Sequence, residues 1–574
     1  MSRVRRLWWT PAAAAVWASS GLGAVADRLA RGRAALGPRA TGFVSSPGPR
    51  SYGAPGAGAR LVEGKYLVDG AVVEHKGPPW ALPGGTGAPD QSAGHGFAWL
   101  DDLAALDTPK ARQVAQDWVF TWIAAPPAGL AWRADVTGRR MVRWIHHAVL
   151  ILNRRSADDS RAYFRSLGRQ ARFLSLRWRA ARPGLPRIEA LTGMAYAGLA
   201  LEGQRGLLGP ALSALGRECA REVAEDGGLR SRNPEALMHA FTALSWVNQT
   251  VSAEGHPLDP QILRALERMA PAIRALRLGD GRMARFHGGD GGLAERIDHA
   301  LADAGISSAA RAEGAMGFAR LTAGRTTVVA DTARVPDPRV AAERAHASTL
   351  GFEMSSGAVP VLVNMGPAAG FGARAARAVR ATAAHNTLVL NRLSSARFIA
   401  DGLIGASFGQ RLVTGPRRVT LKRDANEHGL ALLASHDGYR VTHGMVHERQ
   451  LALVHSGAEL QGRDRIFAAT ATDQERVRDA LARTERDHLV ARIYFRAHPE
   501  VEVSLDLGGT VASLRLPGGE IWLLRPEAGE MMLRDATYFE PDRLTPRHGT
   551  QVVVTLRVWD YEGAVNWVMT RQAT

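Results

Sequence analysis

Two histidines in this sequence stand in loop-like segments where an imidazole could transfer a proton. His287 lies in Phe-His-Gly-Gly, and His385 lies in Ala-His-Asn-Thr. An imidazole with a pKa near ~6.5 can act as a base or an acid at neutral pH, and when neutral it can bind a metal. The glycines after His287 predict an accessible side chain that titrates near neutrality, as a general base should. The alternatives are that His287 is a turn residue and that His385 anchors a strand end by a hydrogen bond.

The segment 230–234, which reads Arg-Ser-Arg-Asn-Pro, carries groups that bind carboxylates. Arg230 and Arg232 could form charge-assisted hydrogen bonds with an anion. The amide of Asn233 suits the same task. Asn at a helix cap followed by Pro at the first helical position is also a common helix start. Both roles remain open for Asn233.

Length and composition describe a folded protein of more than one domain. The chain has 574 residues, of which 46% are hydrophobic and 22% are charged, and about 100–200 residues per domain predicts two or three domains. The net charge is +17, and nearly all the basic residues are arginine. This basicity favours an anionic partner such as acidic polysaccharide, nucleic acid or anionic lipid, or it reflects genomic base composition. The lone Cys219 excludes an intramolecular disulfide and multi-cysteine metal sites.

The N-terminal segment has two interpretations. Arginines at positions 3, 5 and 6 precede two tryptophans, an Ala-rich run and a small-residue tripeptide at 24–26. This order imitates a secretory signal, which would place the protein in the cell envelope or periplasm. The alternative is a basic amphipathic helix that lies on the protein or makes peripheral contact with an anionic membrane, and a cytoplasmic location then stays open. No run of about 18 strongly apolar residues predicts an internal transmembrane helix.

Hydrophobic periodicity divides the chain into three parts. Residues 1–95 read as a basic segment and a Gly/Pro-rich lead-in with one hairpin at 67–74. In 96–310 apolar residues recur three and four apart, which predicts stacked helical hairpins. In 311–574 short segments rich in Val, Leu and Thr follow one another, which predicts a large antiparallel sandwich. The predicted helices are 110–124, 139–153, 160–182, 188–202, 210–225, 234–250 and 260–278, and the predicted strands include 326–331, 350–355, 359–364, 387–391, 446–454 and 551–559.

Several stretches of the chain resemble the heparinase II/III family of polysaccharide lyases. Residues 380–388 contain Ala-His-Asn-Thr, as a sandwich strand of that family does, and residues 346–353 resemble its His-Ala-Asp-x-Leu-Ser-Phe-Glu strand. Residues 437–439 and 447–449 are similar to its "Gly-Tyr, then His-x-Arg" pair of strands. The resemblance runs from about residue 99 to the C-terminus. It implies a multidomain α+β fold in which an N-terminal (α/α) toroid, an incomplete helical barrel, precedes a large antiparallel β-sandwich.

The resemblance also implies that the protein cleaves an acidic, uronic-acid-containing polysaccharide by β-elimination. This reaction requires a group that neutralises the substrate carboxylate, together with a base and an acid. Asn233 matches the neutralising position and His385 matches a histidine near the domain interface, so both are candidate catalytic residues. The candidates for substrate binding are Arg230, Arg232, His447 and Arg449, of which the last two also suit a structural role.

The chain departs from the family pattern where the catalytic tyrosine is expected. No tyrosine occurs between Tyr196 and Tyr439, and the corresponding segment 280–289 offers His287 as a replacement base. The loss of the tyrosine could equally mean an altered substrate or no activity.

A second departure concerns the metal of zinc-containing relatives, which histidines and an aspartate hold. His346 and His385 match two of those positions, but Ser348 replaces the aspartate. Without the anionic ligand the zinc site is poor. We therefore expect no metal and no other cofactor, with a structural metal in the sandwich as the alternative.

Two further functions compete with the lyase. A glycoside hydrolase would need two carboxylates ~5–10 Å apart, and Asp135, Asp280 and Asp290 are candidates. A non-catalytic glycan-binding or envelope polysaccharide assembly protein of the same fold would explain the missing tyrosine and Ser348. Nucleic-acid binding is not expected, because net charge alone supports it. The sequence does not predict an oligomeric state.

Overall fold

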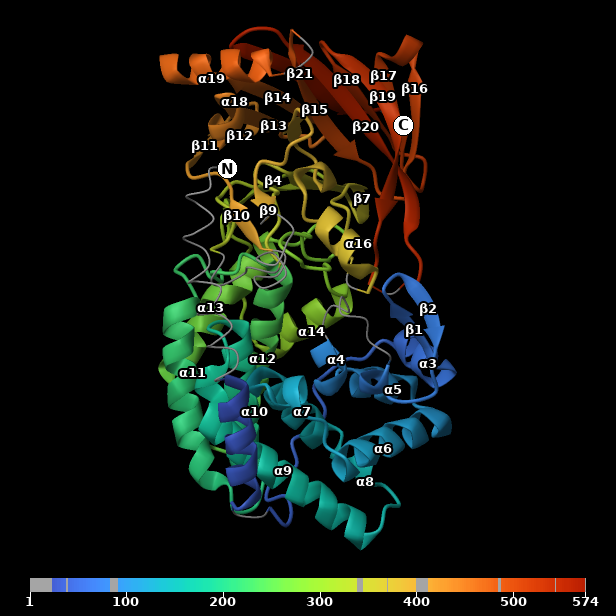
Figure 1. Cartoon of the computed structure of the whole chain (residues 1–574), viewed down its shortest axis with the longest axis vertical. Helices are drawn as coiled ribbons and strands as arrows, with labels where there is room; N and C mark the ends of the chain where they lie inside the picture. The colour runs from blue at the N-terminus through green and yellow to red at the C-terminus, as the bar shows by residue number, and fades with distance from the viewer. Residues whose placement is uncertain are drawn as a thin grey trace.

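Helices fill one half of the molecule and antiparallel sheets fill the other, so that the two halves are stacked along the long axis (Figure 1). The computed structural model describes residues 23–37, 40–82, 91–337, 344–368, 370–398, 411–483, 487–541 and 543–572. The predicted N-terminal signal or amphipathic helix falls mainly on residues 1–22, outside this range, while residues 23–35 are helical. None of the described helices is long and apolar enough to cross a membrane.

The helical half follows the predicted periodicity, and several of its helices begin at a residue whose side chain caps them. Thr108 and Asp259 accept hydrogen bonds from first-turn amides, and Ser156 forms a capping box with Asp159. The predicted hairpin is present as β1 (Lys65–Val68) and β2 (Ala71–Glu74). The main helices are α3 (Pro55–Glu63), α4 (Gln91–His95), α5 (Trp99–Leu106), α6 (Pro109–Ala124), α7 (Ala134–His146), α8 (Ala148–Leu152), α9 (Ala157–Arg177), α10 (Leu185–Ala200), α11 (Leu208–Glu222), α12 (Pro234–Ala253), α13 (Pro260–Ala275) and α14 (Ala294–Asp303).

Helix α10 lies at the centre of this half, because every residue from 190 to 200 is buried. It contacts α7, α9, α11 and α12. The crossing with α7 depends on two glycines: a Cβ on Gly193 would lie 2.4 Å from Cα of Gly138, which no side chain tolerates. Close packing around α10 therefore fixes the positions of α7 and α12, which both contribute to the site described below.

The second half contains three larger antiparallel sheets, which confirms the predicted order of helices followed by an antiparallel β-structure. The five-stranded sheet has β3 (Gly314–Ala315), β4 (Phe318–Ala323), β5 (Thr326–Asp331), β6 (Phe352–Ser356) and β7 (Val359–Leu362) in chain order. The eight-stranded sheet has, in spatial order, β11 (Val419–Asn426), β12 (Gly429–Tyr439), β13 (Met445–Val454), β14 (Glu459–Phe467), β21 (Glu562–Arg571), β18 (Ile521–Pro526), β17 (Val511–Arg515) and β16 (Glu502–Asp506). The four-stranded sheet has β19 (Glu530–Tyr538), β20 (Arg547–Val558), β15 (Leu489–Arg496) and β8 (Leu388–Leu390).

Two loops of the helical half reach the five-stranded sheet. The loop before α12 uses Asp226, whose carboxylate accepts a hydrogen bond from the backbone N–H of Met316 at 2.7 Å. The loop after α13 uses the N–H of Gly279, which donates to Ser355 Oγ at 2.9 Å. Both loops therefore pack against the sheet of β3–β6. We call this contact between the helical half and the sheet the junction, and the candidate residues Arg232, Asn233 and His287 lie there.

Candidate functional site

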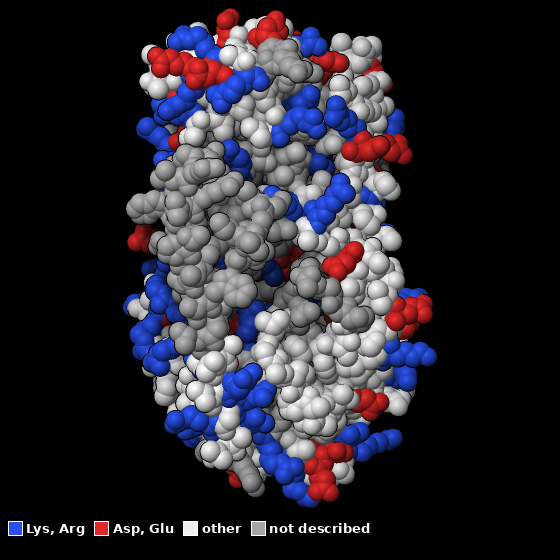
Figure 2. Space-filling model, viewed as in Figure 1, with Lys and Arg blue, Asp and Glu red and all other residues white. Residues whose placement is uncertain are grey.

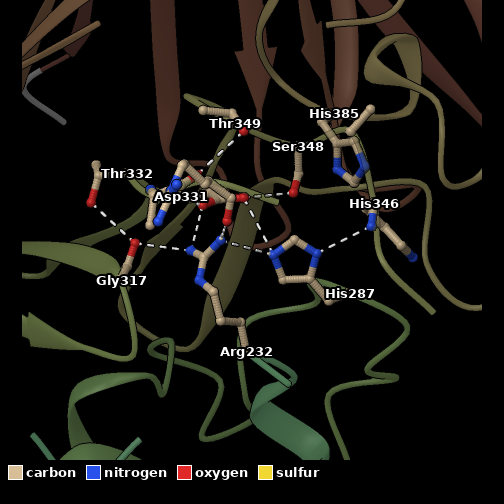
Figure 3. Close-up of polar contacts among 12 residues, drawn as sticks. Arg232, His287, Gly317, Asp331, Thr332, His346, Ser348, Thr349 and His385 are labelled. Atoms are coloured by element: carbon tan, nitrogen blue, oxygen red, sulfur yellow. Dashed lines mark hydrogen bonds and ion pairs between the residues drawn. The ribbon is translucent and has the colours of Figure 1, made fainter. Parts of the chain in front are cut away.

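A buried ion pair joins the two halves at this junction (Figure 3). Arg232, in the loop before α12, donates from Nη2 to Asp331 Oδ1 at 2.5 Å, at the end of β5. The same guanidinium donates to three backbone oxygens at 2.7–3.0 Å, those of Met316, Gly317 and Arg334, and its Nη1 also lies 3.3 Å from His287 Nε2. Burial alone would raise the pKa of Asp331, but the adjacent Arg232 guanidinium holds it below its usual value. The carboxylate is therefore ionised and fully paired.

His287 lies beside this ion pair with both ring nitrogens engaged (Figure 3). Nδ1 accepts a hydrogen bond from the backbone N–H of His346 at 3.1 Å, so the ring proton is on Nε2, which faces Asp331 Oδ2 at 3.5 Å. Burial lowers the pKa of His287. The expectation of an accessible base is wrong, because the loop folds beneath the five-stranded sheet and leaves this side chain 0% exposed.

Asn233 uses both ends of its amide within the protein. Its Oδ1 accepts from the N–H of Ala236 at 3.1 Å and so caps α12. Its Nδ2 donates to the backbone oxygen of His287 at 3.1 Å. The helix-cap role is therefore confirmed, and the role as carboxylate neutraliser stays a prediction.

His385 belongs to a neighbouring buried group. Its Nδ1 lies 2.8 Å from Asn364 Oδ1, and because an amide oxygen only accepts, the ring proton is on Nδ1. Burial lowers the pKa of His385 to about 3. The ring faces that of His346 with 5.2 Å between centroids. His385 is thus a neutral, buried imidazole near the interface, where the resemblance placed it, and its catalytic role stays a prediction.

The histidines at the interface match a zinc site only in part. Among the described residues, His346 Nδ1 and His385 Nε2 have no hydrogen-bond partner, as two metal ligands would require. The third position is Ser348, whose hydroxyl donates to Asp331 Oδ2 at 2.7 Å. No group of three His, Cys, Asp or Glu side chains in the described part of the chain could hold a metal ion. These residues therefore do not fit the zinc site of the metal-containing relatives.

Three of the predicted substrate-binding residues lie away from this junction. His447 and Arg449, on β13, are buried and both bind the carboxylate of Asp464, at 2.8 Å and 2.9 Å. The buried carboxylate occupies these donors, which supports the structural role that the sequence left open for both residues: they stabilise the sandwich. Arg230 is exposed on the surface, 3.9 Å from Glu222. Of the four, only Arg232 joins the cluster with His287.

An accessible cleft of about 240 Å³ lies against the first turns of α12, and its lining on that helix begins with Glu235, two residues after Asn233. Its walls come from the lead-in, from α5, α7, α12 and α14, and from the loop after α13. Gly289 separates the cleft from the buried cluster: a Cβ there would lie 3.1 Å from Asn233 Oδ1 and 3.4 Å from Glu235 Cβ. The charged or titratable residues of the lining include Arg143, Glu235, His239, Arg282, Asp290 and Arg296.

Glu235, His239 and Asp290 form the titratable group of this cleft. The N–H of Asp290 donates to Glu235 Oε2 at 3.1 Å, and His239 Nε2 lies 3.8 Å from Glu235 Oε1. Burial and the charge of Asp290 raise the pKa of Glu235 to about 8. The imidazole of His239 faces the cleft with 57% of its side chain exposed, and partial desolvation there, with the nearby arginines, lowers its pKa below the usual value. At neutral pH the carboxyl carries a proton and the imidazole does not, which is a combination suited to proton transfer.

Sequence reasoning missed Glu235 and His239. The available signal was their spacing of four residues on a helix that starts at Asn233-Pro234, which puts both on one face. Nothing in the spacing shows that this face is open, because the opposite walls come from segments near 50 and 300. Asp290 was considered only as a hydrolase carboxylate.

The comparisons with known proteins agree with this architecture. Residues 306–568 match the model of the heparinase II/III-like C-terminal family, so this part of the chain is similar to that domain. The chain is 29% identical over 557 residues to FtsZ-localized protein C of Caulobacter vibrioides, covering 93% of this chain and 91% of that protein.

Solved polysaccharide lyases share the fold along nearly the whole chain. Heparinase III superposes with a TM-score of 0.68 at 11% identity, covering 97% of this chain and 90% of that structure. A mutant of heparan sulfate lyase HepC from Pedobacter heparinus gives a TM-score of 0.55 at 13% identity, over 90% and 82% of the two chains. The predicted fold class, an α/α toroid followed by an antiparallel β-sandwich, is thereby confirmed.

The buried pair at the junction predicts a large loss of stability when one partner is removed. Replacing Asp331→Asn leaves Arg232 and His287 without the carboxylate, so we expect the free energy of unfolding to fall by about 3–5 kcal/mol. Urea unfolding measures this change in the free energy of unfolding. Asp298→Asn is the matched control, since its pair with Arg277 is exposed and should contribute only about 0–1 kcal/mol. Equal small effects of both changes would contradict the importance of the junction.

The buried histidines predict acid sensitivity. Burial lowers the pKa of His385 and His146 to about 3 and of His95 to about 4, while unfolded histidines titrate near ~6.5. Below pH ~6.5 the unfolded state therefore binds more protons than the folded state. The contribution of these histidines to the free energy of unfolding is complete above that pH. It falls by about 1.4 kcal/mol per pH unit for each histidine as the pH decreases below it. Unfolding midpoints from pH 7.5 to 5 should decrease, and His385→Asn should reduce the slope by one proton. A flat profile would show that these histidines are not held neutral.

Proposed function

We propose that the protein is a polysaccharide lyase that binds an acidic, uronic-acid-containing polysaccharide in this cleft and cleaves it by β-elimination. The supporting observation is the accessible cleft, which combines arginines, a protonated carboxyl and a neutral imidazole beside Asn233 in a lyase fold. Fold alone does not define function. The proposal therefore depends on the cleft.

The arginines of the cleft offer guanidinium donors to a uronate carboxylate, although the lining also contains the carboxyls of Asp101, Asp102, Asp290 and Asp303. Arg143 pairs with Asp101 at 3.1 Å, and Arg296 pairs with Asp102 at 3.4 Å. Arg282 lies on the loop between α13 and α14 and also lines the cleft. A guanidinium that forms charge-assisted hydrogen bonds with the substrate carboxylate would stabilise the negative charge that develops there during elimination.

The overall charge of the molecule points to anionic partners in general and not to one patch. Figure 2 shows Lys and Arg side chains spread over both halves of the face in view. A distributed positive charge accelerates association with any polyanion. The location of the cleft, and not this surface charge, therefore carries the proposal of a polysaccharide substrate. With such a substrate we place the protein in the cell envelope.

A second candidate, a non-catalytic glycan-binding protein of the same fold, has one specific observation in its favour. Asn233, His287 and His385 are all buried and hydrogen-bonded within the protein. The relative from Caulobacter vibrioides carries a name that refers to localisation with FtsZ and not to an activity. A protein of this kind would bind polysaccharide without turnover, at a place where FtsZ is found.

The glycoside hydrolase alternative is not favoured by the carboxyls that the cleft brings together. The backbone N–H of Asp290 donates to Glu235 Oε2 at 3.1 Å, and the charge of Asp290 raises the pKa of Glu235. The two carboxyls therefore form one coupled group, whereas the retaining mechanism uses an acid and a nucleophile on two sides of the scissile bond, ~5 Å apart. Of the other two aspartates considered for this role, Asp135 forms a salt bridge with Arg133 at 2.7 Å, and Asp280 lies 3.6 Å from Arg285.

Ultraviolet absorbance tests the proposed function directly. The elimination product has a C4=C5 double bond conjugated with the uronate carboxylate, which absorbs ultraviolet light, whereas a hydrolysis product has no such bond. We expect a rise when the purified protein meets at least one of heparan sulfate, chondroitin sulfate, hyaluronan and alginate. Arg282→Ala should weaken binding of that polymer about tenfold or more through the lost charge-assisted bond. The exposed Arg161, on α9, provides the control Arg161→Ala.

The outcomes separate the candidates. Binding to the cleft without any absorbance rise would support the non-catalytic protein. A rise in reducing ends without ultraviolet absorbance would indicate hydrolysis. Absence of both binding and turnover across the panel would contradict the proposed function.

A further inference from the structure

Helix α12 presents an imidazole and a carboxyl side by side to the cleft. Glu235 and His239 are one helical turn apart, with 3.8 Å between Oε1 and Nε2, and both line the cleft. The side chain of His239 is 57% exposed, whereas that of His287 is 0% exposed and His385 is fully buried. Of these three histidines, His239 is the one that can touch a bound sugar.

The position of the Glu235 carboxyl is fixed by its surroundings. Its Oε2 accepts the N–H of Asp290 at 3.1 Å, so Oε1 remains directed at His239. The carboxyl lies in the first turn of α12, next to the capped end at Asn233. Acid, base and the candidate neutralising amide are consequently held within one turn and a half of a single rigid helix, as a preorganised site requires.

We propose that His239 is the base and Glu235 the acid of the elimination, an inference that rests on the proposed function. His239 Nε2 takes the C5 proton of the uronate, and the electron pair of that bond becomes the C4–C5 double bond. The C4–O4 bond breaks, and the leaving oxygen takes the carboxyl proton of Glu235. The protein is left with an imidazolium and a carboxylate 3.8 Å apart, and the proton passes from His239 to Glu235 to restore the starting state. No co-reactant is needed.

The charges around the pair support these protonation states. Asp290, on the loop after α13, raises the pKa of both groups, and desolvation raises that of Glu235 while lowering that of His239. Arginines from α7 and from the segment that starts at residue 344 act in the opposite direction to Asp290: they are Arg139, Arg143 and Arg344. The other charged residues that line the cleft are Arg50, Asp101, Asp102, Arg282, Arg296 and Asp303.

The pair accounts for how a lyase of this fold could work without the expected tyrosine. A tyrosine can serve as both base and acid in the reaction, and this chain has no tyrosine between Tyr196 and Tyr439. Two neighbouring residues between which one proton returns through solvent can fill both roles, and the 57% exposure of His239 gives solvent access. Here His239 begins the cycle neutral and Glu235 begins it protonated.

Kinetics of single variants test the inference. With the polymer of the panel that gives the largest absorbance rise, Glu235→Gln and His239→Gln should each lower kcat by about 100-fold or more and leave the Kd for that polymer unchanged. The matched control is the exposed pair Glu427 and His428, whose side chains lie 3.7 Å apart. Glu427→Gln and His428→Gln should leave kcat and Kd unchanged.

The pH dependence adds a readout that loss of structure would not reproduce. For the wild-type protein kcat/KM should follow a bell, with an acid limb below ~6.5 from His239 and an alkaline limb near about 8 from Glu235, and Glu235→Gln should remove the alkaline limb from the residual activity. Carbon-13 NMR of labelled glutamate should show Glu235 protonated at pH 7, independently of turnover. Titration of Glu235 near its ordinary ~4.3 would overturn the inference.

Failure of the inference and failure of the proposed function give different results. An active wild-type protein whose two variants keep kcat near the wild-type value would overturn the His239–Glu235 assignment and leave the lyase intact. A wild-type protein that turns over no polymer of the panel would overturn both. Retained Kd and an unchanged unfolding midpoint establish that an inactive variant is folded.

Discussion

An arginine and an aspartate can be removed from water only if they meet each other and if their remaining donors and acceptors are satisfied. Arg232 and Asp331 meet this condition at the junction of the helical and sheet-containing halves: the carboxylate is 0% exposed and the guanidinium side chain 11% exposed. The loop before α12, the end of β5 and the loop carrying His287 all meet at this pair, and the hydrogen bonds of Asp226 and Gly279 hold the same loops on the sheet. Its geometry therefore determines how the helical half is docked on the sheets.

The docking explains why the residues expected to be catalytic are buried. The ring of His287 lies against Asp331, and the backbone oxygen of His287 accepts a hydrogen bond from the amide of Asn233. Asn233 in turn starts α12, whose next turn faces the cleft. The buried cluster thus fixes the start of α12. Glu235 and His239, which can contact a substrate, lie on the first turns of that helix and face the cleft.

The sequence carried enough information to predict the architecture. Helix caps at Thr108 and Asn233 and the change from helical to strand periodicity near residue 311 correspond to features of the structure, since both are local. Burial of His287 was not predictable, because it depends on Asp331, 44 residues further along the chain. The choice between a substrate-binding and a structural role for His447 and Arg449 was open for the same reason: their partner Asp464 is on the neighbouring strand β14. The cleft was not predictable either, because its walls come from segments near residues 50, 100, 240 and 300.

The central claim is that an acidic polysaccharide binds along the exposed face of α12. Hydrogen–deuterium exchange with and without heparan sulfate or alginate oligosaccharides tests where such a ligand binds, whether or not it is cleaved. The account predicts slower exchange confined to the segments that line the cleft, the first turns of α12 and residues 282–297. Protection elsewhere on the surface, with these segments unchanged, would contradict it.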